Sequence, residues 1–186
     1  MVDNEFGYTR WGMDWVRLAE PLRQIRPDPL LPRARSIARN DGVRTEVEGR
    51  IVRAHIHRGG QASVVHLELA SLPRTALTAL SGIVGAEPTL LTDEMHTAAV
   101  AAGISVVPEP TAIDCSCSAR TARCLHVLAT FYALARRVDE DPRLSLDLQG
   151  YGHPEHGDAP GESGGEPDAP RWVPLTALDP AMFFDG

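Results

Sequence analysis

Hydrophobic and polar residues alternate in three neighbouring stretches of the chain, residues 43–47, 50–57 and 63–69. Glu48-Gly49 separates the first two and the run 58–61, which contains two glycines, separates the last two, so both gaps are turn sequences. The middle stretch has an apolar face, formed by Val52, Ala54 and Ile56, and a mostly polar face, formed by Ile51, Arg53, His55 and His57. The pattern predicts a three-stranded antiparallel meander whose polar face, with its two histidines, lies in solvent.

Helical spacing of apolar residues precedes and follows this meander. Trp11, Trp15, Leu18 and Leu22 recur at intervals of three or four residues and predict a helix over 11–25, with the tryptophans packed in the core. Further helices are predicted, in chain order, over residues 33–40, 73–84, 93–102 and from about Cys124 to Val138. A short apolar run at 104–107 predicts a buried strand. The expected fold class is α+β, a small antiparallel sheet with flanking helices.

All three cysteines of the chain lie within ten residues, in the spacing Cys115-x-Cys117-x6-Cys124-x-His126. Three thiolates and an imidazole form a complete tetrahedral shell for zinc, with no position left for water. Residues two apart on a strand share a face, so Cys115 and Cys117 can both reach one ion. Cys124 and His126 can do so if a helix begins at Cys124, with Thr121 as a candidate N-cap. The sequence predicts one structural zinc ion, held by a short β-hairpin and a helix.

These residues also resemble the SWIM zinc finger, whose Cys-x-Cys-xn-Cys-x-His pattern is followed by an Ala/Leu-rich helix. Bacterial SWIM proteins are the most similar, because an Asp-Pro segment (139–144 here) follows the helix and a Trp-Gly-x3-Trp opening (11–15) and an Arg-x-Arg-Ser-x-Ala-Arg stretch (33–39) precede the sheet. The similarity covers about residues 10–150. It implies an appended ββα-type zinc finger that binds DNA or protein, often together with a Swi/Snf-type helicase ATPase.

Beyond the finger, the composition changes twice. Residues 151–170 are rich in Gly, Pro and acidic side chains and contain no Val, Ile, Leu, Met or Phe, as expected for a flexible linker. Residues 171–186 are apolar again, and we expect them to dock on this protein or on a partner. The predicted division is an N-terminal α+β region (1–110), a SWIM-type finger (111–150), the linker and this C-terminal segment.

The charge of the chain limits its partners. All 18 basic residues are arginine, yet the formal net charge is −7 and the sequence pI is about 5.4. This balance argues against strong, non-specific nucleic-acid binding by the chain alone, since such binding depends on neutralising phosphates. The sequence contains neither a signal peptide nor an apolar run long enough for a membrane helix. Thiols gathered in a metal cluster fit a reducing compartment, so we expect a cytoplasmic protein.

No catalytic motif accompanies the cluster, and we expect a protein that is not an enzyme. The leading hypothesis is a zinc-binding interaction module, accessory to a Swi/Snf-type helicase or another DNA-transaction protein. Two alternatives stay open: a thiol redox sensor that uses Cys115 and Cys117, and a direct DNA-binding protein that uses the arginine-rich region 33–58.

Overall fold

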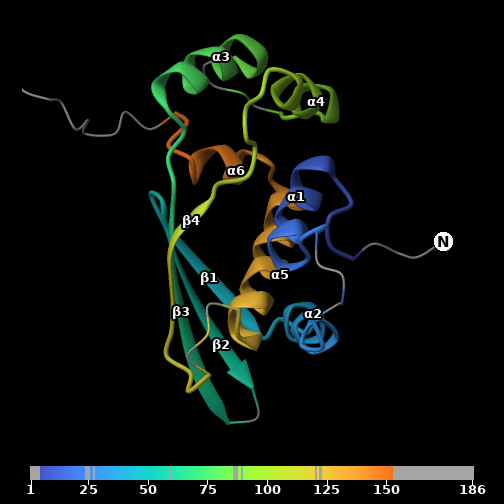
Figure 1. The fold of residues 1–186 in the computed structure, drawn as a ribbon, viewed down its shortest axis with the longest axis vertical. Helices are drawn as coiled ribbons and strands as arrows, with labels where there is room; N and C mark the ends of the chain where they lie inside the picture. The colour runs from blue at the N-terminus through green and yellow to red at the C-terminus, as the bar shows by residue number, and fades with distance from the viewer. Residues whose placement is uncertain are drawn as a thin grey trace, which may run out of the picture. The chain divides into compact units, whose positions relative to one another are not determined.

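A four-stranded antiparallel sheet and one long helix frame the protein in a computed structural model (Figure 1). The structure describes residues 5–23, 26, 28–58, 60–85, 88, 90–119, 121 and 123–152. They belong to the first of two units of the chain, Met1–Glu155. Apart from Tyr151 and Gly152, the predicted linker lies outside the described residues, as does the whole C-terminal segment. The predicted domain boundaries therefore stay predictions.

Strands β1 (Val43–Glu48), β2 (Ile51–Arg58) and β3 (Gln61–Leu69) form the predicted meander. Glu48 pairs with Ile51, which leaves a two-residue turn in which Gly49 has a φ of 55°, a conformation that favours glycine. Strand β4 (Pro110–Cys115) pairs with β3 and completes the order β1-β2-β3-β4. The meander is confirmed, and β4 extends it.

The two faces of the sheet differ as the alternation predicts. Val52, Ala54 and Ile56 are buried, and so are Val65 and Leu67 beside them on β3. On the opposite face of β2, Arg53 and His57 are exposed and His55 is half-buried. Helices α1 (Arg10–Ala19) and α2 (Leu31–Arg39) pack against α5 (Leu125–Glu140), which in turn contacts β1, β3 and β4 (Figure 1).

Helix α1 is shorter than predicted and ends at Ala19 instead of residue 25. Pro21 disfavours helical geometry in the residue before it, which accounts for the early end. Leu22, which the spacing placed on the predicted helix, lies beyond its end and is 83 % exposed. Trp11 and Trp15 are buried as expected; their indole N–H groups donate to the Thr92 carbonyl at 3.1 Å and to Ser145 Oγ at 2.8 Å.

The region between β3 and β4 holds α3 (Arg74–Val84) and α4 (Asp93–Ala101), both close to their predicted bounds. Residues 104–107 do not form the predicted strand, although Ile104 and Val106 are buried. The Val106 carbonyl accepts a hydrogen bond from Ser145 Oγ, a residue of the short helix α6 (Arg143–Asp147), so a side chain satisfies it in place of a neighbouring strand. The apolar run correctly predicted that this segment is buried. The prediction that it forms a strand was wrong.

The α+β fold, with a four-stranded antiparallel sheet and flanking helices, is confirmed. The appended finger is not shown. The strand that leads to the cysteines is the fourth strand of the main sheet, and the helix that follows them packs in the core. Among the described residues, no helix has both the length and the apolar character needed to cross a membrane.

Candidate metal centre

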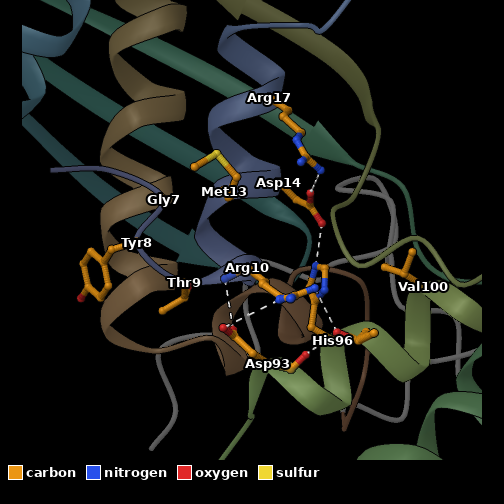
Figure 2. A pocket seen from close by; sticks show the side chains of 11 residues that line it. Gly7, Tyr8, Thr9, Arg10, Met13, Asp14, Arg17, Asp93, His96 and Val100 are labelled. Carbon is orange, nitrogen blue, oxygen red and sulfur yellow. Dashed lines mark hydrogen bonds and ion pairs between the residues drawn. The ribbon is translucent and has the colours of Figure 1, made fainter. Parts of the chain in front are cut away.

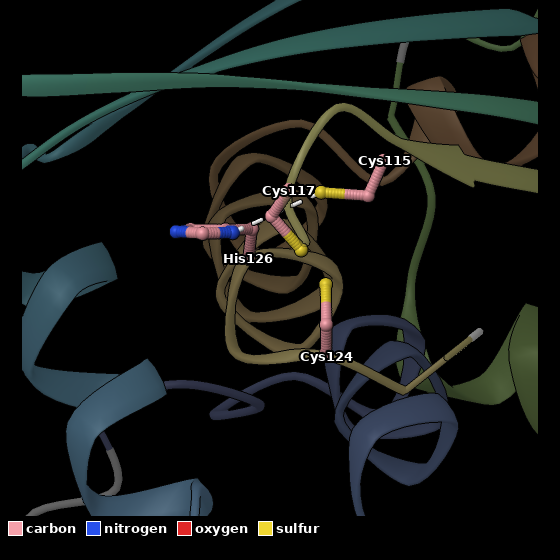
Figure 3. Close-up of side chains that lie close together, drawn as sticks. All are labelled: Cys115, Cys117, Cys124 and His126. Atoms are coloured by element: carbon pink, nitrogen blue, oxygen red, sulfur yellow. Dashed lines mark hydrogen bonds between the residues drawn. The ribbon is translucent and has the colours of Figure 1, made fainter. Parts of the chain in front are cut away.

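Three short pieces of backbone bring the predicted ligands together. Cys115 is the last residue of β4, Cys117 lies in the turn after it, Cys124 is the N-cap of α5, and His126 is the second residue of that helix. Figure 3 draws the four side chains converging in front of the first turn of α5. Their candidate ligand atoms all lie within 4.8 Å of one another. The structure therefore brings together every residue of the predicted site.

Strand pairing fixes the first two ligands. Cys115 is opposite Val65, a buried residue, so its side chain faces the helices. Pairing continues one residue further, because the Ser116 N–H donates to the Val64 carbonyl and the Val64 N–H donates to Ser116 Oγ, both at 2.9 Å. Cys117 then lies at the beginning of the turn. The sequence predicted a separate short β-hairpin for these two ligands. Instead, the strand that carries Cys115 pairs with β3 of the main sheet.

The start of α5 fixes the other two ligands. Cys124 has extended backbone (φ −71°, ψ 165°) and its carbonyl accepts the first helical hydrogen bond, from the Leu128 N–H at 3.1 Å. The predicted entry at Cys124 is correct. The predicted N-cap at Thr121 is wrong: Thr121 Oγ1 accepts from the Arg123 N–H at 3.0 Å, before the helix begins. The start of a helix also favours negative charge close to it.

The distances fit a tetrahedral ion. Zinc bonds of about 2.3 Å to sulfur and about 2.0 Å to nitrogen imply a sulfur–nitrogen separation near 3.5 Å in a tetrahedral shell. Cys115 Sγ lies 3.8 Å from His126 Nδ1, close to that value. His126 Nε2 lies 3.5 Å from Ser63 Oγ, on the side away from the thiols. Nδ1 is thus the candidate ligand atom, and Ser63 is placed to orient the ring, as second-shell partners of ligand histidines do.

The thiol pKa values of Cys115 and Cys117 are shifted in opposite directions. Burial raises the pKa of the Cys115 thiol to about 12, and hydrogen bonds with the Cys117 and Cys124 sulfurs add to the rise. Burial also acts to raise the pKa of Cys117, but the Ala119 N–H and the two neighbouring sulfurs outweigh it and lower that pKa. Cys117 therefore ionises more readily while Cys115 keeps its proton. A bound divalent cation allows both to ionise, since coordinated thiols lose their protons.

The other polar residues that the sequence singled out lie elsewhere. The polar face of β2 carries His55 and His57 away from the centre, as predicted, and His55 Nε2 is 3.9 Å from a Glu46 carboxylate oxygen. Within the part of the chain that the structure describes, the cysteine–histidine group is the one cluster suited to a metal.

The arginines of region 33–58 do not share one face. Arg33 is exposed on α2, whereas Arg35 and Arg39 on the same helix form ion pairs with Glu20 and Glu5. Arg53 stands on the outer face of the sheet. The region predicted as one candidate DNA-binding stretch is divided between a helix and a sheet.

Sequence reasoning missed the residues that surround the ligands. Ser63 and Ser116 were not singled out, although Ser116 lies between two cysteines and small polar residues inside a ligand pattern are a usable signal. Arg123, next to Cys124, was also missed; its guanidinium donates to the Leu18 and Ala19 carbonyls.

A pocket lies near the N-terminal end of α1, away from the contacts of Arg123. This pocket, of about 410 Å³, separates the N-terminal segment and α1 from α4 (Figure 2). Its polar floor is a chain of contacts in which Asp14 accepts from Arg17 at 2.6 Å and contacts His96 Nε2 at 2.8 Å. Arg10 and Asp93 also line it, so its formal charges balance and favour no one class of ligand.

Fold and site together define an α+β protein with a cysteine–histidine group that could bind a zinc ion. Comparisons with protein-family models, with curated proteins and with solved structures find no match for this chain.

Proposed function

We propose that this chain is a non-catalytic interaction module whose fold depends on one structural zinc ion bound by Cys115, Cys117, Cys124 and His126. The observation that carries the proposal is the convergence of all four ligand atoms within 4.8 Å from three separate pieces of backbone. Three thiolates and one imidazole satisfy zinc completely. Packing alone gives no reason to gather three thiols and an imidazole at one point.

The donor set favours a structural role over a catalytic one. Catalytic zinc sites keep one position for water or substrate, and a shell of four protein ligands has none. Cys124 is 2 % exposed, so a substrate would have to approach past the other ligands. We therefore propose that the protein acts by binding and catalyses no reaction.

The resemblance to bacterial SWIM proteins supports a more specific role. By that resemblance, the partner is a Swi/Snf-type helicase ATPase or another DNA-transaction protein, and this chain is its accessory subunit. The similarity covers about residues 10–150 and is most specific in the ligand pattern and in the helix after it.

Direct DNA contact is a second candidate, favoured by the exposure of Arg23, Arg26 and Arg33 near and on α2. Phosphate contacts of this kind give affinity that falls steeply with salt. Reversing the charge at Arg26 and Arg33 together should remove any binding to a 30-base-pair duplex in low salt, as measured by fluorescence anisotropy. Tight binding at physiological salt would promote DNA contact to the main function.

Metal analysis tests the proposal. Protein purified without added metal should contain one zinc per chain by mass spectrometry of the metal, and replacement by Co²⁺ should give the absorption bands of a tetrahedral thiolate site. Cys117→Ser should lose both properties, whereas His57→Ala, a histidine on the outer face of the sheet, should keep them. Substoichiometric zinc together with a labile disulfide between Cys115 and Cys117 would support the redox alternative instead.

A further inference from the structure

One side chain connects the candidate metal centre to the N-terminal helix. Arg123 precedes the ligand Cys124, and its guanidinium reaches the end of α1, where Nη1 donates to the Leu18 carbonyl at 3.2 Å and Nη2 to the Ala19 carbonyl at 2.7 Å. The last carbonyls of a helix have no partners within it, and a cation there also offsets the helix dipole. Arg123 therefore caps α1 from a segment more than 100 residues away in sequence.

The two ends of α1 are held in different ways. At its start, the buried Asp139 carboxylate accepts from the Gly7 N–H at 2.6 Å and from the Thr9 N–H at 2.8 Å, and this anchor belongs to the C-terminal part of α5. At its end, Arg123 comes from the loop between two predicted ligands. Glu20, just beyond the helix, adds contacts to Arg35 and Tyr132. Only the end of α1 thus depends on the loop of the metal centre.

A bound metal would restrain the position of Arg123. Six residues separate Cys117 from Cys124, and the described ones are neither helix nor strand. Binding Cys117 and Cys124 to one ion would fix the distance between the two ends of this loop. Because Arg123 is adjacent to a ligand, closing the loop also holds its guanidinium near α1.

We infer that zinc occupancy is transmitted through Arg123 to the end of α1. The inference rests on the proposed zinc site.

Hydrogen exchange on the full chain tests the inference. In the zinc-loaded protein, Arg123→Gln should speed exchange of the amides of residues 17–20 by about fivefold to tenfold, the effect of losing a charged cap. Exchange in β2 and β3 should stay unchanged, and the variant should keep one zinc. The matched control is Arg17→Gln, which removes an arginine from α1 without touching the loop and should leave residues 18–20 within twofold of the original.

The possible results separate the two ideas. If the unchanged protein holds no zinc, both the proposed function and this inference are wrong. If one zinc is present and Arg123→Gln leaves exchange at residues 17–20 as it was, the inference alone is overturned. Removing zinc should speed exchange at these amides more in the unchanged protein than in Arg123→Gln, because the variant has already lost the route through Arg123. An equal effect in both proteins would mean that zinc acts on α1 by another route, such as the unfolding of α5, and would overturn the inference.

Discussion

The two ends of helix α5 are tied to distant parts of the chain in contrasting ways. At the N-terminal end, three cysteines and a histidine converge in a group that could bind a zinc ion. At the C-terminal end, the Asp139 carboxylate is 5 % exposed and is satisfied entirely by hydrogen bonds from Gly7 and Thr9. The contrast teaches that a buried polar cross-link can be completed by the chain itself or can require a ligand from solution, and only the second kind makes folding depend on conditions.

Removing zinc should have the largest effect, at the N-terminal end of α5. Structural zinc contributes on the order of 10 kcal/mol in small finger peptides. Chelation, or Cys117→Ser, should therefore unfold at least residues 111–138, and α5 should take its neighbours with it because it packs in the core. Circular dichroism during heating would measure the loss. Unchanged thermal stability of the metal-free protein would mean that the centre is not structural.

Replacing Asp139 should weaken the contacts at the C-terminal end of α5 while zinc remains bound. Asp139→Asn turns one acceptor oxygen into a donor that faces backbone N–H groups, which should lower the free energy of unfolding by about 2–4 kcal/mol. Urea unfolding of the zinc-loaded protein measures this. Glu140→Gln alters the exposed neighbour and should stay within about 0.5 kcal/mol of the original.

Gly12 offers an independent test of the same anchor. A Cβ atom on Gly12 would lie 2.1 Å from an Asp139 carboxylate oxygen, so even alanine does not fit. Gly12→Ala should destabilise the zinc-loaded protein by about 1–3 kcal/mol through overpacking. In the double variant with Asp139→Asn the two costs should not add, because both act on one contact. Simple additivity would show that the glycine serves some other purpose.

Acid should distinguish the two ends by a smaller, graded effect. Because the metal-free Cys115 thiol has its pKa raised to about 12, it must release a proton to bind zinc at any pH below that value. Each proton released makes zinc affinity fall about tenfold per pH unit as pH decreases. Competition with a chelator between pH 8 and 6 should therefore show a slope of at least one. A flat profile would show that thiolates do not hold the ion.

The smallest effect is expected on the outer face of the sheet. His55→Ala and His57→Ala should change stability by less than about 0.5 kcal/mol, because these side chains lie on the polar face of β2. Neither should alter zinc content. A loss of zinc in either variant would show a ligand outside the four that converge at α5.

Several features follow from local chemistry that the sequence displays directly. The alternation in residues 51–57 predicts which face of β2 is buried, because side chains alternate along a strand whatever surrounds it. The candidate ligand set can also be predicted from the sequence, since thiol and imidazole groups at these spacings suit one ion. The start of a helix at Cys124 follows as well, because the middle of a helix would point Cys124 and His126 to different sides.

Other features depended on which distant segments meet. The partner of β4, the burial of Asp139 and the cap that Arg123 provides all join residues separated by more than 40 and up to 132 positions in sequence. The spacing of hydrophobic residues does not predict such long-range contacts. From the sequence alone, Asp139 resembles an aspartate at an exposed helix end, and residues 104–107 resemble a strand. Sequence determined the composition of the metal centre, because ligand chemistry is local. Tertiary structure decided that the centre belongs to the core sheet, because a strand's partner and a buried charge's donors come from elsewhere in the chain.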